Sequence, residues 1–185
     1  MSDPAAPASV PPATTISRPA SRPAGLYRRL ASLAYEALLL TALLFIANFI
    51  LLPLVSPGRP LPARGLVVPD LPSRVLIFAA LFAVAAAYCV GSWTGGRRTL
   101  PMKTWRLRVA DRAGRPIDYR RGFVRYLAAW IGPALALATY VAMRPWGLGG
   151  VALVPLVLNY LAAFVDPERQ FLHDRIAGTR IVQDP

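Results

Sequence analysis

Glu36 is the strongest candidate for a reactive side chain in this sequence. It lies within an apolar run, Leu30 to Leu52, which is long enough to cross a hydrocarbon layer of about 30 Å at about 1.5 Å per residue. A carboxylate inside such a layer costs about 2.5–3.5 kcal/mol on insertion scales, so it should face protein or water. Arg29 lies seven positions earlier, on the same helical face and roughly 10 Å away along the axis.

Two interpretations of Glu36 stay open. The apolar surroundings favour the neutral carboxylic acid and Arg29 favours the carboxylate, so the side chain can exchange a proton near neutral pH. That chemistry suits a proton or cation pathway. Alternatively, Glu36 pairs with a group on a neighbouring helix and only fixes the packing of the bundle.

The sequence offers few other side chains that could carry out chemistry. The chain has one cysteine and one histidine, so neither an internal disulfide nor a site with several histidine ligands can form. His173 can relay protons, but a hydrogen bond that shapes the turn before Gly178 is the favoured role. We find no nucleophile with a base beside it and no cluster of metal ligands. The sequence therefore predicts no enzyme, no cofactor and no metal centre.

Composition places the chain in a membrane. Hydrophobic residues make up 55% of the sequence, and the mean hydropathy is +0.44, more than one soluble core requires. The net charge is +12, but the basic residues cluster in loops between apolar segments. This placement follows the positive-inside rule rather than the pattern of a nucleic-acid-binding protein, so no nucleic-acid partner is expected.

Four apolar segments predict an all-α membrane protein with about four transmembrane helices, which cover residues 30–52, 75–93, 123–143 and 147–165. The last two contain Gly132-Pro133 and Pro155 near their middles, which predicts broken or kinked helices. Because only a short turn separates these two segments, they should form a tight hairpin, either spanning or re-entrant.

The loop between the second and third segments, residues 94–122, is rich in arginine. Within it Trp105, Leu107 and Val109 alternate with Arg106, Arg108 and Ala110, a period-two pattern typical of a strand. We predict a short cytoplasmic β-hairpin at the membrane surface, with arginines that meet anionic lipid headgroups.

The ends of the chain differ from the apolar segments. Residues 1–24 are rich in Pro and Ala, which predicts a disordered tail, and residues 166–185 form a second tail. The early residues lack the basic start and short apolar run of a signal peptide, so the first apolar helix is expected to stay as an anchor. The distribution of arginines favours cytoplasmic positions for both ends.

The most specific pattern is the ending from Leu172 to Val182, LHDRIAGTRIV. Together with Arg29 before the first helix and the segment Thr99 to Val109, TLPMKTWRLRV, it makes the chain similar to the RDD family of bacterial membrane proteins. The resemblance covers roughly residues 24–182, so residues 25–182 are taken as an RDD-like transmembrane domain. It implies a multi-pass protein of the bacterial inner membrane.

The RDD family is named for an arginine at the start of the first helix, an aspartate within that helix, and a second aspartate. By this resemblance Arg29, with Arg28 beside it, matches the arginine and Asp174 matches the second aspartate. Glu36 stands where the family has aspartate, and Pro101 stands where a glycine is common. Glu36 keeps the carboxylate but places it one methylene further from the backbone.

These residues lead to two expected functions. In the first, Glu36 carries protons or cations in a small transporter, and Arg29 binds Asp174 to lock the tail against the first helix. The chain is short for a transporter and has no recognisable internal repeat, so it should act as a homo-oligomer. In the second, Arg29, Glu36 and Asp174 form a structural network in a membrane scaffold or assembly factor.

Overall fold

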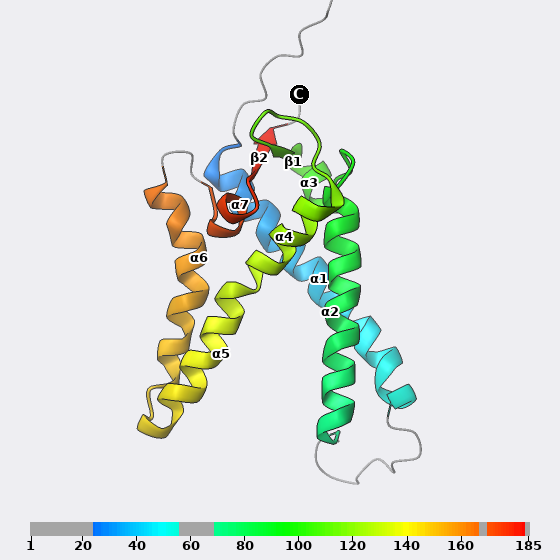
Figure 1. Ribbon diagram of the computed structural model, residues 1–185, viewed down its shortest axis with the longest axis vertical. Coiled ribbons are helices and arrows are strands. Elements are labelled where there is room, and N and C mark those ends of the chain that lie inside the picture. The colour runs from blue at the N-terminus through cyan, green and yellow to red at the C-terminus, as the bar shows by residue number, and fades with distance from the viewer. Residues whose placement is uncertain (1–23, 56–68, 167–169, 184–185) are drawn as a thin grey trace, which may run out of the picture.

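A computed structural model describes residues 24–55, 69–166 and 170–183 (Figure 1). The predicted disordered tail therefore lies outside the described residues, except for Ala24. The elements, in chain order, are α1 (Leu26–Val55), α2 (Leu71–Trp93), α3 (Leu100–Thr104), β1 (Leu107–Asp111), α4 (Tyr119–Ala129), α5 (Ile131–Met143), the 3-10 helices η1 (Arg144–Trp146) and η2 (Gly149–Ala152), α6 (Leu153–Val165), α7 (Leu172–Ile176) and β2 (Thr179–Gln183).

Helices α1 and α2 confirm the first two predicted apolar helices, and they pack against each other. They are 30 and 23 residues long, and each exceeds the roughly 20 residues that a membrane crossing requires. Large apolar side chains on α1 are exposed to the surroundings, among them Phe45 and Phe49. Such faces are stable in lipid, where no hydrophobic penalty opposes their exposure.

The third apolar segment begins earlier than predicted and is interrupted near its middle. Helices α4 and α5 meet at Trp130 and together form a candidate span, Tyr119–Trp146. Pro133 is the third residue of α5. At this position a backbone N–H has no acceptor within the helix, so proline, which lacks the N–H, costs no helical hydrogen bond. The proline thus marks the beginning of a new helix rather than a kink in the middle of one.

The fourth predicted span, residues 147–165, is not confirmed. Three helices of the described chain are long and apolar enough to cross a membrane, and α6 is not among them. It has 13 residues, or about 20 Å of helix. Residues before it form η1 and η2, and Pro155 again lies in the first turn. The predicted helical hairpin itself is found, because α5 packs against α6.

The strand predicted in the basic loop is present, but its predicted partner is wrong. Instead of a local hairpin, β1 pairs antiparallel with β2 at the end of the chain, with Leu107 opposite Gln183 and Asp111 opposite Thr179. The residues after Asp111 form a turn in which the Asp111 carboxylate accepts hydrogen bonds from the backbone N–H groups of Ala113 and Arg115. This turn leads the chain away from β1 and leaves its edge open to β2.

The buried core gathers at the end of the molecule that carries the two strands, here called the sheet end. Its members come from six elements and from the loops beside them, and include Ala85, Cys89, Trp93, Leu107, Val109, Tyr126, Phe171 and Ile181. From the sheet end the pair α1–α2 and the pair α5–α6 extend apart (Figure 1). The backbone N–H of Ala24 donates to the carbonyl of Ile181 at 3.2 Å, so both ends of the described chain lie at the sheet end.

Candidate functional site

An ion pair between Arg125 and Asp174 lies at the centre of the sheet end. Arg125 projects from α4 and is 3% exposed, while Asp174 projects from α7 and is 0% exposed. Nη1 of Arg125 donates to Oδ1 of Asp174 and, at 2.9 Å, to the hydroxyl of Thr179. The guanidinium also lies 4.9 Å from the ring centroid of Trp93 at the end of α2. This one side chain therefore links α2, α4, α7 and β2.

Arg29 is buried beside this pair, at the start of α1. Its Nη2 donates to the carbonyl of Ile181 at 3.0 Å, and Asp174 and Asp166 lie within electrostatic reach of it. The predicted direct bond from Arg29 to Asp174 stays a prediction, whereas Arg125 contacts Asp174 directly. Arg28, the neighbouring arginine, is exposed.

His173 is buried next to Asp174, with its Nε2 3.6 Å from Oδ1 of Asp174. Its ring stacks on Phe171, with the ring centroids 5.6 Å apart. Burial lowers the pKa of His173 to about 4, against the opposing effect of Asp174. The side chain is therefore neutral at physiological pH, which favours a structural role over proton relay.

Glu36 lies where α1 meets α2 and α3, with its own hydrogen-bond partners but within electrostatic reach of Arg125. The hydroxyl of Thr99 donates to its Oε2 at 2.5 Å, and Thr99 also caps α3 by accepting a hydrogen bond from the backbone N–H of Met102. Glu36 and Tyr88 also lie within interaction distance of each other. Oε1 of Glu36 and the hydroxyl of Tyr88 are buried, and neither makes a hydrogen bond of standard geometry to a described residue.

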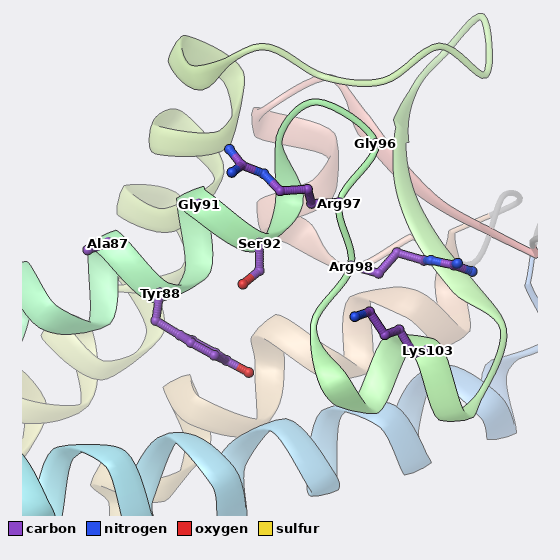
Figure 2. Close-up of a pocket in the computed structure, with 8 residues that line it drawn as sticks. All are labelled: Ala87, Tyr88, Gly91, Ser92, Gly96, Arg97, Arg98 and Lys103. Atoms are coloured by element: carbon purple, nitrogen blue, oxygen red, sulfur yellow. The ribbon is translucent and has the colours of Figure 1, made fainter.

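Tyr88 connects Glu36 to a pocket, here called the α2–α3 pocket. Tyr88 and Ser92 line it from α2, Arg97 and Arg98 from the following loop, and Lys103 from α3, and its volume is about 490 Å³. Its other lining residues are glycine and alanine. Figure 2 shows Tyr88 reaching from α2 toward α1, on the side of the pocket nearer to the membrane helices.

The structure thus divides the predicted site residues into two groups. Asp174 and His173 gather with Arg29 and Arg125 at the sheet end, whereas Glu36 belongs to a separate group with Thr99 and Tyr88. The first group holds charges in place, because an arginine does not release its proton in proteins. The second group has the chemistry for proton exchange, since it contains a carboxylate and a hydroxyl beside it.

Sequence reasoning missed Arg125, Thr99 and Tyr88. One signal marks Arg125: the buried face of α4 includes Gly122, Arg125 and Tyr126, and a charged residue at apolar spacing on an amphipathic helix indicates a buried ion pair. Thr99 precedes Pro101, the arrangement of an N-cap before a helix. Nothing in the sequence marks Tyr88.

The described residues contain no group of three or more His, Cys, Asp or Glu side chains placed to hold a metal ion.

The described chain has three helices that are long and apolar enough to cross a membrane, and a polar end at which Ala24 and β2 lie together. This arrangement is that of a multi-pass membrane protein. The family model of the RDD family matches residues 23–178, which is most of the chain, so this protein belongs to the RDD family. No curated protein and no solved structure matches the chain.

Proposed function

We propose that this protein provides a pathway for protons, coupled to the movement of another ion, with Glu36 as the group that takes up and releases the proton. Tyr88 connects Glu36 to the α2–α3 pocket, from which water delivers the proton. The first group, at the sheet end and centred on Arg125 and Asp174, holds the pathway's helices in register and takes no part in the transfer.

The buried Oε1 of Glu36 is the observation that carries this proposal. Buried carboxylate oxygens are normally hydrogen-bonded, because leaving one unsatisfied costs about 1–3 kcal/mol or more. Oε1 makes no hydrogen bond of standard geometry to a described residue, while Oε2 is held by Thr99. As a carboxylate, Oε1 can accept a hydrogen bond from the Tyr88 hydroxyl, and as a carboxylic acid it can donate one to the same oxygen. The pair can therefore accommodate both protonation states, as a group that exchanges a proton requires.

The charge of the pocket favours a proton over a metal cation at this position. Three basic side chains, Arg97, Arg98 and Lys103, line the α2–α3 pocket, and they repel cations from its mouth. A proton reaches Glu36 by exchange along water and hydroxyl groups and does not need to cross the pocket as a hydrated cation. The coupled ion therefore uses a different route or is an anion.

Proton flux in liposomes tests the proposal. Liposomes that contain the protein should dissipate a pH gradient faster than empty liposomes, and Glu36→Gln should abolish the difference while the protein stays folded. Asp118→Asn is the matched control, since it also removes one carboxylate but lies at the cap of α4, where Asn caps equally well. Equal flux from the Glu36→Gln variant and the native chain would contradict the proposal.

A membrane scaffold is the second candidate, and the buried charges at the sheet end favour it. Arg29 and Arg125 hold α1, α2, α4, α7 and β2 together. These contacts serve the fold whether or not the protein transports an ion. In that case Glu36→Gln should lower the amount of folded protein, and the surviving molecules should behave as the native chain does.

We assign the protein to the bacterial inner membrane, with the sheet end and both chain ends in the cytoplasm. The support is the gathering of arginines at the sheet end, which follows the positive-inside rule. Exposed arginines of the basic loop then face anionic lipid headgroups. A homo-oligomer remains the proposed assembly, because the chain supplies few helices for a complete transport path.

A further inference from the structure

The α2–α3 pocket has a composition that the proton pathway does not explain. Its lining combines three cationic side chains with two hydroxyl groups, and no carboxylate is among the lining residues. Elsewhere at this end of the molecule several arginines meet carboxylates, as Arg115 meets Asp111 at 3.0 Å and Arg175 meets Asp166 at 3.0 Å. The lining of the pocket therefore supplies positively charged groups and no negatively charged one.

The three cations have different roles. Arg97 donates to the hydroxyl of Tyr119 at 2.6 Å, and Figure 2 shows it turned back along the end of α2. Arg98 is directed away from Ser92 in the same view and lines the outer part of the pocket. Lys103 is exposed, and its ammonium makes no ion pair with any residue in the described ranges.

Three side chains with donor groups line the space between α2 and α3. In Figure 2 Lys103 extends from α3 toward α2, Ser92 lies on the facing end of α2, and Tyr88 lies below Ser92. An ammonium and two hydroxyls match the acceptor oxygens of a phosphate group, which bind strongly to charged donors. The volume of about 490 Å³ exceeds that of a bare phosphate and accommodates the group to which it is attached.

We infer that the α2–α3 pocket binds a phosphate-bearing anion, with Lys103 as the charged anchor and Ser92 as a hydrogen-bond donor. The anion is either a soluble phosphate compound or the headgroup of an anionic phospholipid, because the pocket adjoins the end of a membrane helix. Tyr88 places this anion beside Glu36. The inference rests on Lys103 and Ser92 and does not depend on proton transfer by Glu36.

Two probes distinguish the sources. Inorganic phosphate is titrated into the full-length protein in neutral detergent by calorimetry, with chloride as the reference anion. Separately, enrichment of labelled phosphatidylglycerol around the protein is measured in phosphatidylcholine vesicles. Lys103→Gln should weaken binding of the effective probe about tenfold, as expected for the loss of a charged hydrogen bond. Ser92→Ala should weaken it several-fold.

Arg112→Gln is the matched control, because it removes the same charge from an exposed position outside the pocket. The inference is supported if binding of either probe falls in the Lys103 and Ser92 variants and persists in Arg112→Gln. Binding of phosphate would then identify a soluble ligand, and binding of phosphatidylglycerol would identify a lipid headgroup. The inference is overturned if neither probe exceeds its reference, if Arg112→Gln weakens binding equally, or if the pocket variants bind normally. Glu36→Gln should still bind the anionic probe. Loss of proton flux in that variant can therefore be distinguished from loss of anion binding in the pocket variants.

Discussion

Arg125 and Asp174 offset each other's buried charge. Both are almost fully buried, and moving a charge out of water costs several kcal/mol unless a partner offsets it. Arg125 gains from Asp174, from Thr179 and from the face of Trp93. The removal of one charge therefore leaves the other unpaired in a place that water does not reach.

Arg125→Gln should destabilise the protein by about 3–5 kcal/mol, the usual cost of breaking a buried ion pair from one side. Arg121→Gln, four positions earlier on the same helix, should cost less than about 1 kcal/mol, because surface pairs contribute little and the Arg121 side chain is 51% exposed. The free energy of unfolding in mixed micelles measures both changes. Equal losses would show that the burial of Arg125 is not important to the fold.

His173 should make stability depend on pH in the acid range. Because burial lowers its pKa to about 4, the folded protein keeps it neutral at a pH where the unfolded chain, with a pKa near 6.5, binds a proton. The unfolded state then holds more protons, so stability falls by about 1.4 kcal/mol per pH unit between about pH 6.5 and about pH 4.

Thermal unfolding of the native chain and of His173→Gln over this pH range tests the effect. The variant should lose the part of the slope that His173 contributes, while the rest of the pH dependence is common to both proteins. Parallel curves for the two proteins would mean that His173 gains its proton as easily in the folded state as in the unfolded one.

The contact of α4 with α2 depends on a glycine. A Cβ atom on Gly122 would lie 2.9 Å from Cγ2 of Thr94 and 3.3 Å from Cγ1 of Val90. The hydroxyl of Thr94 is held by the carbonyl of Val90 at 2.9 Å, so its methyl group cannot turn away freely. This close approach brings Arg125, one turn further along α4, over Trp93.

Gly122→Ala should therefore destabilise the protein by about 1–3 kcal/mol, as overpacking of a core does. Gly91→Ala is the matched control, because a Cβ there meets nothing within 4 Å. In a helix interior it should stabilise by roughly 0.5–1 kcal/mol. The unfolding midpoints of the two variants should move in opposite directions, and a shift in the same direction would contradict the contact between α4 and α2.

The sequence predicted those elements that are determined by local patterns. Apolar runs located α1 and α2, and the alternation around Leu107 and Val109 located β1. The partner of β1 could not be found in this way, because β2 lies at the other end of the chain and strand pairing is decided in three dimensions. Pro133 and Pro155 indicated breaks, but a proline is compatible with both a kink and a first turn.

The candidate site was predicted less completely than the fold. Glu36 was found because a carboxylate is rare in an apolar run, and Asp174 was found through the family resemblance. Arg125 is one of many arginines in a basic segment, and its burial depends on how α4 lies against α2 and α7. Tyr88 is an ordinary apolar-helix residue until the packing of α1 against α2 places it beside Glu36.

The position of the chain ends constrains how the whole molecule crosses the membrane. Ala24 and β2 lie together at the sheet end, while the turn between α5 and α6 lies at the opposite end, level with the start of α2 (Figure 1). After α5 the chain must therefore return to the sheet end through α6, although α6 is short. A complete hairpin is expected rather than a re-entrant one.

Labelling of single cysteines in a Cys89→Ala background tests this topology. Leu148→Cys, in the turn between α5 and α6, should react with an impermeant thiol reagent from the periplasmic side, and Arg112→Cys, at the sheet end, from the cytoplasmic side. Both positions are exposed. Reaction of both from the cytoplasmic side would identify a re-entrant hairpin, and the reverse pattern would invert the proposed orientation.

The central claim is that Glu36 exchanges a proton, and infrared difference spectroscopy of the protein in lipid tests it most directly. A carbonyl band of a protonated carboxylic acid should decrease as the pH is raised stepwise. The account predicts that this band is missing from Glu36→Gln and present in Asp118→Asn. A difference spectrum that is the same in Glu36→Gln and the native chain would contradict it.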